Sequence, residues 1–224
     1  MLSKQNRLTI QTDLSGFSFK IYDKNGSPLH SERRDKPLDL EQEAKNSLLL
    51  KSYSVVTVYV SSGKSTLIPS KYYSIKERRN ILSKMFPLFD DEEVMSLEIP
   101  SHKAVVVYAV SKDLISMMSS HFDSVKYCPI IYPLIDRISS LTVNNRLLMA
   151  YSGGMVHIAA AEREKLLLAN SYPASDIVTA EYFLLSVAKE VMFNPEHTTL
   201  STFGYISDSD RQNLSKYFAD IVSL

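Results

Sequence analysis

The chain contains the same strand-rich pattern twice. Near the N-terminus, apolar and polar residues alternate on both sides of Ser15-Gly16, and a tight-turn signal follows at Asn25-Gly26. The pattern returns after Arg146-Leu147, which corresponds to Arg7-Leu8, and Ser152-Gly153-Gly154 then takes the place of the first turn. Each copy predicts three meandering strands followed by a helix, a further strand and a helix. We therefore expect two related halves, over residues 1–122 and 123–224.

The resulting fold class is α/β with mixed sheets. In the first half the predicted elements are strands over 7–13, 16–23, 27–32, 54–60, 64–68 and 103–110, and helices from Leu38-Asp39 and over 74–86. In the second half, helices are expected from Ser175-Asp176 and from Ser207, with a strand over 199–206 between them. The buried stripe of the last helix is expected to comprise Leu214, Tyr217, Phe218 and Ile221.

The tetrapeptide Gly63-Lys64-Ser65-Thr66 resembles the end of a phosphate-binding P-loop. A P-loop needs an earlier glycine at the position that Val58 occupies, and it must continue directly into a helix. Here the chain continues as Leu67-Ile68-Pro69, which favours a strand. We therefore predict a hairpin turn at 61–64 and no P-loop.

Composition argues against several classes of function. Lys+Arg and Asp+Glu both number 25, so the formal net charge is zero and nucleic acid is not an expected partner. No apolar run approaches about 18 residues, so we expect a cytoplasmic protein without direct membrane insertion. The one cysteine, Cys128, lies in an apolar run and is expected to be a buried structural thiol. The five histidines are scattered, so no metal site is expected.

Several segments carry a resemblance to known proteins: DLSGFSFKIYDKNG, TLIPSKYY, VVVYAVSKDL, AEYFLLSVAKEV and FGYISDSDRQNLSKYF. They resemble a family of Bacteroidetes proteins that is known only as a domain of unknown function. The whole chain is similar to the actin-like ATPase superfamily and, more distantly, to the actin-like scaffolds of pilus and secretion machines. This resemblance implies a compact actin-like fold built from two ribonuclease H-like halves.

The resemblance also implies candidate residues for binding a nucleotide. In active members each half begins with an Asp in a glycine-rich hairpin, where backbone N–H groups approach the phosphates and the acids organise Mg²⁺. The matching positions are Asp13, Ser15, Gly16, Ser152, Gly153 and Gly154, with Gly204 in the adenosine-side motif. However, Ser15 replaces a glycine, and Tyr151 stands where the second acid belongs. A phenol with a pKa near 10 does not replace a carboxylate toward Mg²⁺ at neutral pH.

We therefore expect a non-catalytic pseudo-ATPase module that acts on an unknown protein partner and has no bound cofactor. The alternative is a switch that still binds ATP, with or without Mg²⁺, between the two halves. That alternative needs an open cleft that is not filled by Phe17, Tyr151 or Met155. ATP hydrolysis, sugar-kinase-type transfer and a ribonuclease H-like nuclease are less favoured, because only Asp13 supplies an acid at the expected place. The glycines also fit plain hairpin turns. The oligomeric state is left open.

Overall fold

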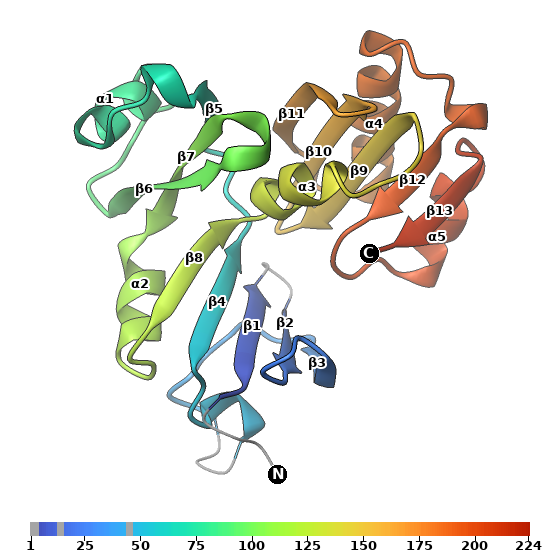
Figure 1. Cartoon of the computed structure of the whole chain (residues 1–224). Coiled ribbons are helices and arrows are strands. Elements are labelled where there is room, and N and C mark those ends of the chain that lie inside the picture. Colours follow the sequence, from blue (N-terminus) through green and yellow to red (C-terminus); the bar gives the residue numbers. More distant parts are fainter. Residues whose placement is uncertain (1–4, 13–15, 44–46) are drawn as a thin grey trace.

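The computed structural model describes residues 5–12, 16–43 and 47–224. Within these ranges the strands form two five-stranded sheets and one three-stranded sheet (Figure 1). The two larger sheets lie in different halves of the molecule, and the small sheet, with α1 beside it, extends from the first half (Figure 1). The chain is thus of mixed α/β class, as the sequence predicts.

The first sheet has the strand order β3-β2-β1-β4-β8. Its strands are β1 (Arg7–Thr12), β2 (Phe17–Tyr22), β3 (Pro28–Arg34), β4 (Val55–Val60) and β8 (Val125–Pro129). Strand β2 is antiparallel to both of its neighbours, β1 and β3, whereas β4 is parallel to both β1 and β8. This sheet therefore combines an antiparallel meander with two parallel crossover strands.

The second sheet repeats this arrangement with the order β11-β10-β9-β12-β13. Its strands are β9 (Asn145–Ser152), β10 (Met155–Glu162), β11 (Lys165–Pro173), β12 (Thr199–Thr202) and β13 (Asp220–Ser223). The meander is again antiparallel, and β12 is parallel to β9 and to β13. The matching order and directions confirm the duplication that the sequence predicts.

The remaining elements connect and cover these sheets. The helices are α1 (Arg78–Ser83), α2 (Lys112–Ser119), α3 (Ile131–Ile138), α4 (Ile177–Glu190) and α5 (Asp208–Leu214). The small sheet consists of β5 (Ser65–Pro69), β6 (Glu92–Ile99) and β7 (Ala104–Ser111), in the order β5-β7-β6. Short 3₁₀ turns lie at Leu48–Leu50, Ser70–Tyr72, Ile75–Glu77, Pro100–His102 and Pro195–His197.

Helix α3 joins the cores of the two halves. Its residues Leu134, Ile135 and Ile138 are fully buried in one cluster with Ile10 of the first sheet and Leu148 of the second. Full burial of a Leu or Ile side chain contributes about 1.5–3 kcal/mol. A separate cluster lies on the opposite face of the second sheet, under α4 and α5. The halves therefore share a continuous apolar core along α3.

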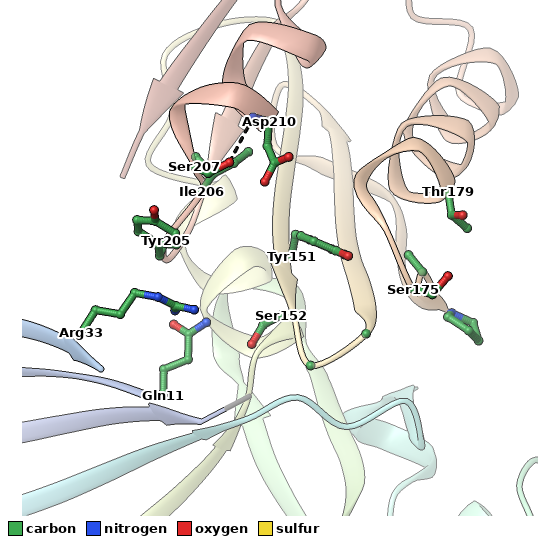
Figure 2. Close-up of a pocket in the computed structure, with 14 residues that line it drawn as sticks. Gln11, Arg33, Tyr151, Ser152, Ser175, Thr179, Tyr205, Ile206, Ser207 and Asp210 are labelled. Carbon is green, nitrogen blue, oxygen red and sulfur yellow. Dashed lines mark hydrogen bonds between the residues drawn. The ribbon is translucent and has the colours of Figure 1, made fainter. Parts of the chain in front are cut away.

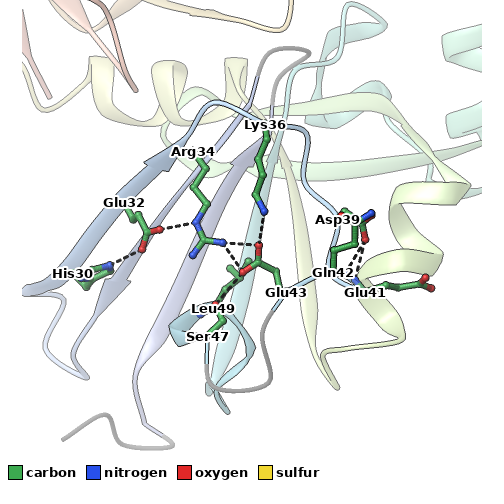
Figure 3. A network of polar contacts seen from close by, with 10 residues as sticks. All are labelled: His30, Glu32, Arg34, Lys36, Asp39, Glu41, Gln42, Glu43, Ser47 and Leu49. Atoms are coloured by element: carbon green, nitrogen blue, oxygen red, sulfur yellow. Dashed lines mark hydrogen bonds and ion pairs between the residues drawn. The ribbon is translucent and has the colours of Figure 1, made fainter.

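The helix predicted from Leu38-Asp39 is not found in the described part of that segment. Residues 37–39 have no regular secondary structure, residues 40–43 form bends, and residues 48–50 form a single 3₁₀ turn. The Asp39 carboxylate accepts hydrogen bonds from the backbone N–H groups of Glu41 and Gln42, which favours a turn over a helix. The Glu43 carboxylate accepts a hydrogen bond from the Arg34 guanidinium of β3 (Figure 3). Side-chain hydrogen bonding thus outweighs helix propensity here.

The predicted hairpin between β4 and β5 is also wrong. Strand β4 pairs with β1 and β8, whereas β5 pairs with β7 of the small sheet, so residues 61–64 carry the chain from one sheet to another. The conclusion that this is no P-loop is confirmed, because the chain continues into strand β5 and not into a helix. The Lys64 ammonium binds the Glu92 carboxylate at 2.7 and 2.8 Å.

The last helix is shorter than predicted. Helix α5 ends at Leu214. Ile221 is also buried, but it belongs to strand β13, which pairs with β12. Phe218 is buried, but Tyr217 is exposed. The β-branched pair Ile221-Val222 favours a strand, and its pairing with β12 completes the sheet. The apolar residues keep a helical spacing beyond Leu214 although the helix ends there, and for this reason the predicted helix was too long.

The structure also bears on the predicted boundary at residue 122, on Cys128 and on membrane insertion. Strand β8 follows the boundary predicted at residue 122 but pairs with β4, so the first sheet extends to Pro129. Cys128 is buried, as predicted, and burial raises the pKa of its thiol to about 12. No helix in the described ranges is long and apolar enough to span a membrane.

Candidate functional site

A cavity of about 650 Å³ opens between the two halves, beside the turn that joins β9 to β10 (Figure 2). The first half contributes Gln11 of β1 and Arg33 of β3. The other lining residues are Tyr151, Ser152, Gly153, Gly154, Pro173, Ala174, Ser175, Thr179, Tyr205, Ile206, Ser207 and Asp210. This volume lies in the range of small-molecule sites in proteins.

The hairpin of β9 and β10, which we call the second hairpin, forms one wall of this cavity. Gly153 and Gly154 have φ angles of 61° and 71°, and Ser152 pairs with Met155 across the turn. Two successive positive φ angles define the tight hairpin turn that matches the twist of the flanking strands. The structure thus brings together three of the predicted residues, Ser152, Gly153 and Gly154, at the cavity.

Ser152 has an unusual hydroxyl. The residue is only 5% exposed, and its Oγ has no hydrogen-bond partner within the described structure. Figure 2 shows this hydroxyl on the side of the cavity where Gln11 lies. A buried polar group without a partner costs about 1–3 kcal/mol. A polar ligand atom in the cavity would relieve that cost.

The end of β9 carries no carboxylate, because its last two residues are Tyr151 and Ser152. Burial raises the pKa of Tyr151, and the nearby carboxylates of Asp176 and Asp210 raise it further, so its phenol stays protonated. Among the described lining residues, Asp210 is the one that carries a carboxylate. No cluster of three His, Cys, Asp or Glu side chains with metal-binding geometry occurs in the described ranges. The described lining residues therefore offer a divalent cation one carboxylate, that of Asp210.

Helix α4 begins beside the cavity, but its N-terminus is already capped. The Asp176 Oδ1 accepts a hydrogen bond of 2.7 Å from the Thr179 N–H. This hydrogen bond lowers the pKa of Asp176 and keeps its carboxylate charged. A negative cap offsets the attraction that a helix N-terminus has for anions. The Gly153-Gly154 turn is therefore the better position for an anionic group.

The other predicted site residues lie elsewhere. Asp13 and Ser15 lie outside the described residues. A Cβ on Gly16 would come within 2.3 Å of the Arg34 carbonyl oxygen, so this glycine allows close packing of backbone on backbone. Gly204 has a φ of 87°, and a Cβ there would lie 3.0 Å from the Gln11 Oε1. Gly204 thus lets Gln11 of the first half approach the second half.

The three side chains that would rule out nucleotide binding if they filled the cleft lie mostly outside it. Phe17 is fully buried in the core. Met155 packs toward Gly63, where its Cε would lie 2.9 Å from an added Cβ. Of the three, Tyr151 alone lines the cavity. The cleft is therefore open beside the second hairpin, with one aromatic side chain in its wall.

A hydrogen-bonded chain that the sequence did not predict joins the halves next to this cavity. Ser61, which follows β4, donates from Oγ to the Ser152 carbonyl oxygen at 2.7 Å. The same Oγ lies 3.0 Å from the His157 Nε2, and the His157 Nδ1 lies 2.7 Å from the Ser171 Oγ. We call Ser61, His157 and Ser171 the cross-half latch.

The protonation of the latch follows from its geometry. Ser61 has one hydroxyl proton and gives it to Ser152, so it accepts from the His157 Nε2–H. The His157 Nδ1 then accepts from the Ser171 hydroxyl. Burial lowers the pKa of His157 to about 4, which keeps the ring neutral. The sequence shows a histidine within the apolar strand of 155–161, which indicates burial but does not identify its partners.

Comparison with known proteins places this geometry in context. A family described as "Protein of unknown function (DUF3822)" matches residues 2–221. A Bacteroides thetaiotaomicron VPI-5482 protein "with actin-like ATPase fold and unknown function" superposes with a TM-score of 0.77 at 24% identity, covering 99% of this chain and 91% of that one. A chain of the PilM-PilN type IV pilus biogenesis complex gives a TM-score of 0.52 at 11% identity, covering 97% and 88%. No curated protein matches the chain.

These similarities extend over nearly the whole length of the chain. They confirm the resemblance to an actin-like family of unknown function and the fold that it implies. Because the match covers nearly its whole length, the chain belongs to the DUF3822 family, and its fold is that of the actin-like ATPases.

Proposed function

We propose that this chain is a non-catalytic actin-like module that acts through contact with a partner protein. One observation carries the proposal: the last two residues of β9, Tyr151 and Ser152, place a protonated phenol and a hydroxyl where an active member carries an acid. Without that carboxylate the hairpin lacks a charge that would organise Mg²⁺ and the attacking water. ATP hydrolysis is therefore not expected.

Two further points support action through a protein partner. The cross-half latch and the shared core along α3 hold the halves together, which suits a scaffold better than a hinge that must open at every turnover. In addition, the PilM chain of similar fold is part of a complex with PilN. We therefore infer a scaffold for another protein, and we propose that it acts in the cytoplasm.

The test is a phosphate-release assay on the purified chain with ATP and Mg²⁺. Wild-type protein should release phosphate no faster than buffer. An Asp13→Ala variant serves as the control for contaminating activity, because a contaminant is unaffected by this substitution. Phosphate release that requires Mg²⁺ and is lost in Asp13→Ala would overturn the non-catalytic assignment.

A second candidate function is nucleotide binding without hydrolysis. The observation in its favour is the unpartnered Ser152 hydroxyl beside the Gly153-Gly154 turn, in a cavity large enough for a nucleotide. Calorimetric titration with ATP, with and without Mg²⁺, tests it. Heat that is lost in both Asp13→Ala and Ser152→Ala would support a nucleotide-dependent switch. Absence of heat in the wild type at millimolar ATP would exclude it.

A further inference from the structure

A second, smaller hollow lies on the face of the first sheet that is turned away from its core. Its volume is about 270 Å³, and it shares Gln11, Arg33 and Tyr205 with the larger cavity. Side chains of β1, β2 and β3 form one side, and Arg137 of α3 and Phe203 form the other. We call this hollow the basic groove.

The basic groove carries an excess of positive charge. Lys20, Arg33 and Arg137 line it from three different elements. Glu32 also borders it, but its carboxylate is bound by Arg34 at 2.6 Å and by His30 at 3.2 Å. Asp35 lies 3.3 Å from the Arg33 Nε and is 87% exposed, so water screens that pair. Lys20 and Arg137 are exposed and form no ion pair with any described residue, so these two side chains carry the charge that attracts an acidic ligand.

Aromatic rings fix the two arginines of the groove. The Arg33 guanidinium lies 4.6 Å from the centre of the Tyr205 ring, and the Arg137 guanidinium lies 5.0 Å from that of Phe203. Tyr59 in turn packs edge-on against Phe203 at 5.4 Å. Stacking engages the flat face of a guanidinium, whereas its N–H groups project from the edge in the geometry that binds carboxylates. The rings also offer apolar contact area.

The same face is covered in the second half. There, Leu148 and Ala150 of β9 pack against α3 in the shared core. The sequence repeat pairs Leu148 with Thr9 and Ala150 with Gln11, and both of these first-half residues line the groove. The position that α3 occupies over the second sheet thus corresponds to the basic groove over the first. A segment of chain lying on this face would complete the pseudo-symmetry.

We propose that the basic groove binds an acidic peptide segment of a partner protein. This inference rests on the proposed function and identifies the surface and the partner's chemistry. An apolar segment would leave Lys20 and Arg137 facing it without counter-charge. Nucleic acid is disfavoured because the chain has 25 acidic and 25 basic residues, and the groove is short for tracking a phosphate backbone.

The experiment is phage display of random peptides on the full chain, followed by fluorescence anisotropy with the enriched peptides in synthetic form. Enriched sequences should contain several Asp or Glu residues together with an aromatic residue. Lys20→Glu and Arg137→Glu should each weaken binding about tenfold, since each replaces an attractive charge with a repulsive one. Lys189→Glu, an exposed site on α4, is the matched control and should leave binding unchanged.

Several results would overturn the inference. These are a selection without acidic enrichment, or enriched peptides that bind both groove variants as tightly as wild type. Binding of an oligothymidylate that is lost in Lys20→Glu would assign the groove to nucleic acid instead. Because Lys20 and Arg137 are both exposed, thermal melting should show both variants folded, and either one suffices. A failed selection leaves the phosphate-release result standing, so the two proposals fail separately.

Discussion

The two five-stranded sheets share their strand order and directions, but they are covered differently. In β9 and β10 nearly every residue from 146 to 161 outside the turn is buried, because α4 and α5 pack on one face and α3 on the other. In β1 and β2 burial alternates: Leu8 and Ile10 are buried, whereas Thr9 and Gln11 are partly open. One backbone arrangement therefore supports both a closed sheet and a half-open one.

The difference shows which sheet is buried on both faces and which sheet has a face available for binding a ligand. Strands β9 and β10 are buried on both faces, so their residues are mostly apolar, with Arg146 and His157 among the buried polar exceptions. The open face of the first sheet can carry charges such as Lys20 and Arg33 without a desolvation cost. In the first half, the ion pairs that Arg34 forms with Glu32 and Glu43 cover part of the sheet, as helices do in the second half.

The largest test of this contrast is a pair of matched substitutions on β1 and β9. Leu148→Lys should destabilise the protein by more than about 3 kcal/mol, because it buries a charge in the shared core. Thr9→Lys, at the corresponding position, should change stability by less than about 0.5 kcal/mol. Urea unfolding followed by circular dichroism measures both. Equal destabilisation would show that the two faces are covered alike.

A second test concerns the buried latch of the second sheet. His157 has a pKa of about 4 in the folded state, below its value of about 6.5 when unfolded. Its neutral form therefore stabilises the protein fully above pH 6.5, and this contribution is lost as the pH falls toward 4. The destabilisation caused by His157→Gln should thus shrink by about 2 kcal/mol between pH 7 and pH 5.

Urea unfolding of wild type and variant at each pH gives that difference directly, and other titrating groups cancel in it. His197→Gln, at an exposed histidine, is the control. If the His157→Gln difference stays constant with pH, the ring is not held in its neutral form.

A third test addresses the ion pairs of the first half. Arg34 binds Glu43, whose side chain is 3% exposed, and Glu43 also receives a hydrogen bond from Ser47 (Figure 3). Burial opposes ionisation of Glu43, but its contacts with Arg34 prevail and lower its pKa. Glu43→Gln should cost about 1–2 kcal/mol at neutral pH, since Arg34 keeps Glu32 as a partner. Glu41→Gln, on the exposed surface, should cost nothing measurable by thermal melting.

The smallest expected effect is a gain in stability. Glu181 of α4 is buried, and its Oε1 has no partner within the described residues. Burial raises its pKa, so the charge on this side chain weakens folding progressively as the pH rises above the unfolded value. Glu181→Gln should raise stability by about 1 kcal/mol at pH 8 and by less at pH 4. A loss at pH 8 would mean that the charge is favourable.

The sequence predicts the duplication because its signals are local. Alternating residues, the Asn25-Gly26 turn and the Gly153-Gly154 turn specify the meanders without reference to distant contacts. The segment after β3 was predicted wrongly, because Asp39 and Glu43 form side-chain hydrogen bonds that helical periodicity does not reveal. The β4–β5 hairpin failed for a similar reason, since sheet membership is decided by distant partners such as β8 and β7.

The candidate site was predictable only in part. The hairpin residues Ser152, Gly153 and Gly154 follow from the resemblance, and they do line the cavity. Gln11, Arg33 and Asp210 reach the same cavity from separate elements, and no spacing along the chain brings them together. The latch joins Ser61 to His157 across 96 positions, so no local pattern could indicate it.

The apolar side of α3 has a consequence for how the protein is made. When the ribosome has completed α3, residues Leu134, Ile135 and Ile138 have no second sheet to pack on until β9, β10 and β11 follow. Nascent chains at that stage expose an apolar surface, and exposed apolar surfaces favour aggregation or binding by chaperones. A translational pause at which α3 has left the ribosome but β11 has not would therefore lower the yield of native protein more than a pause after β11 has emerged.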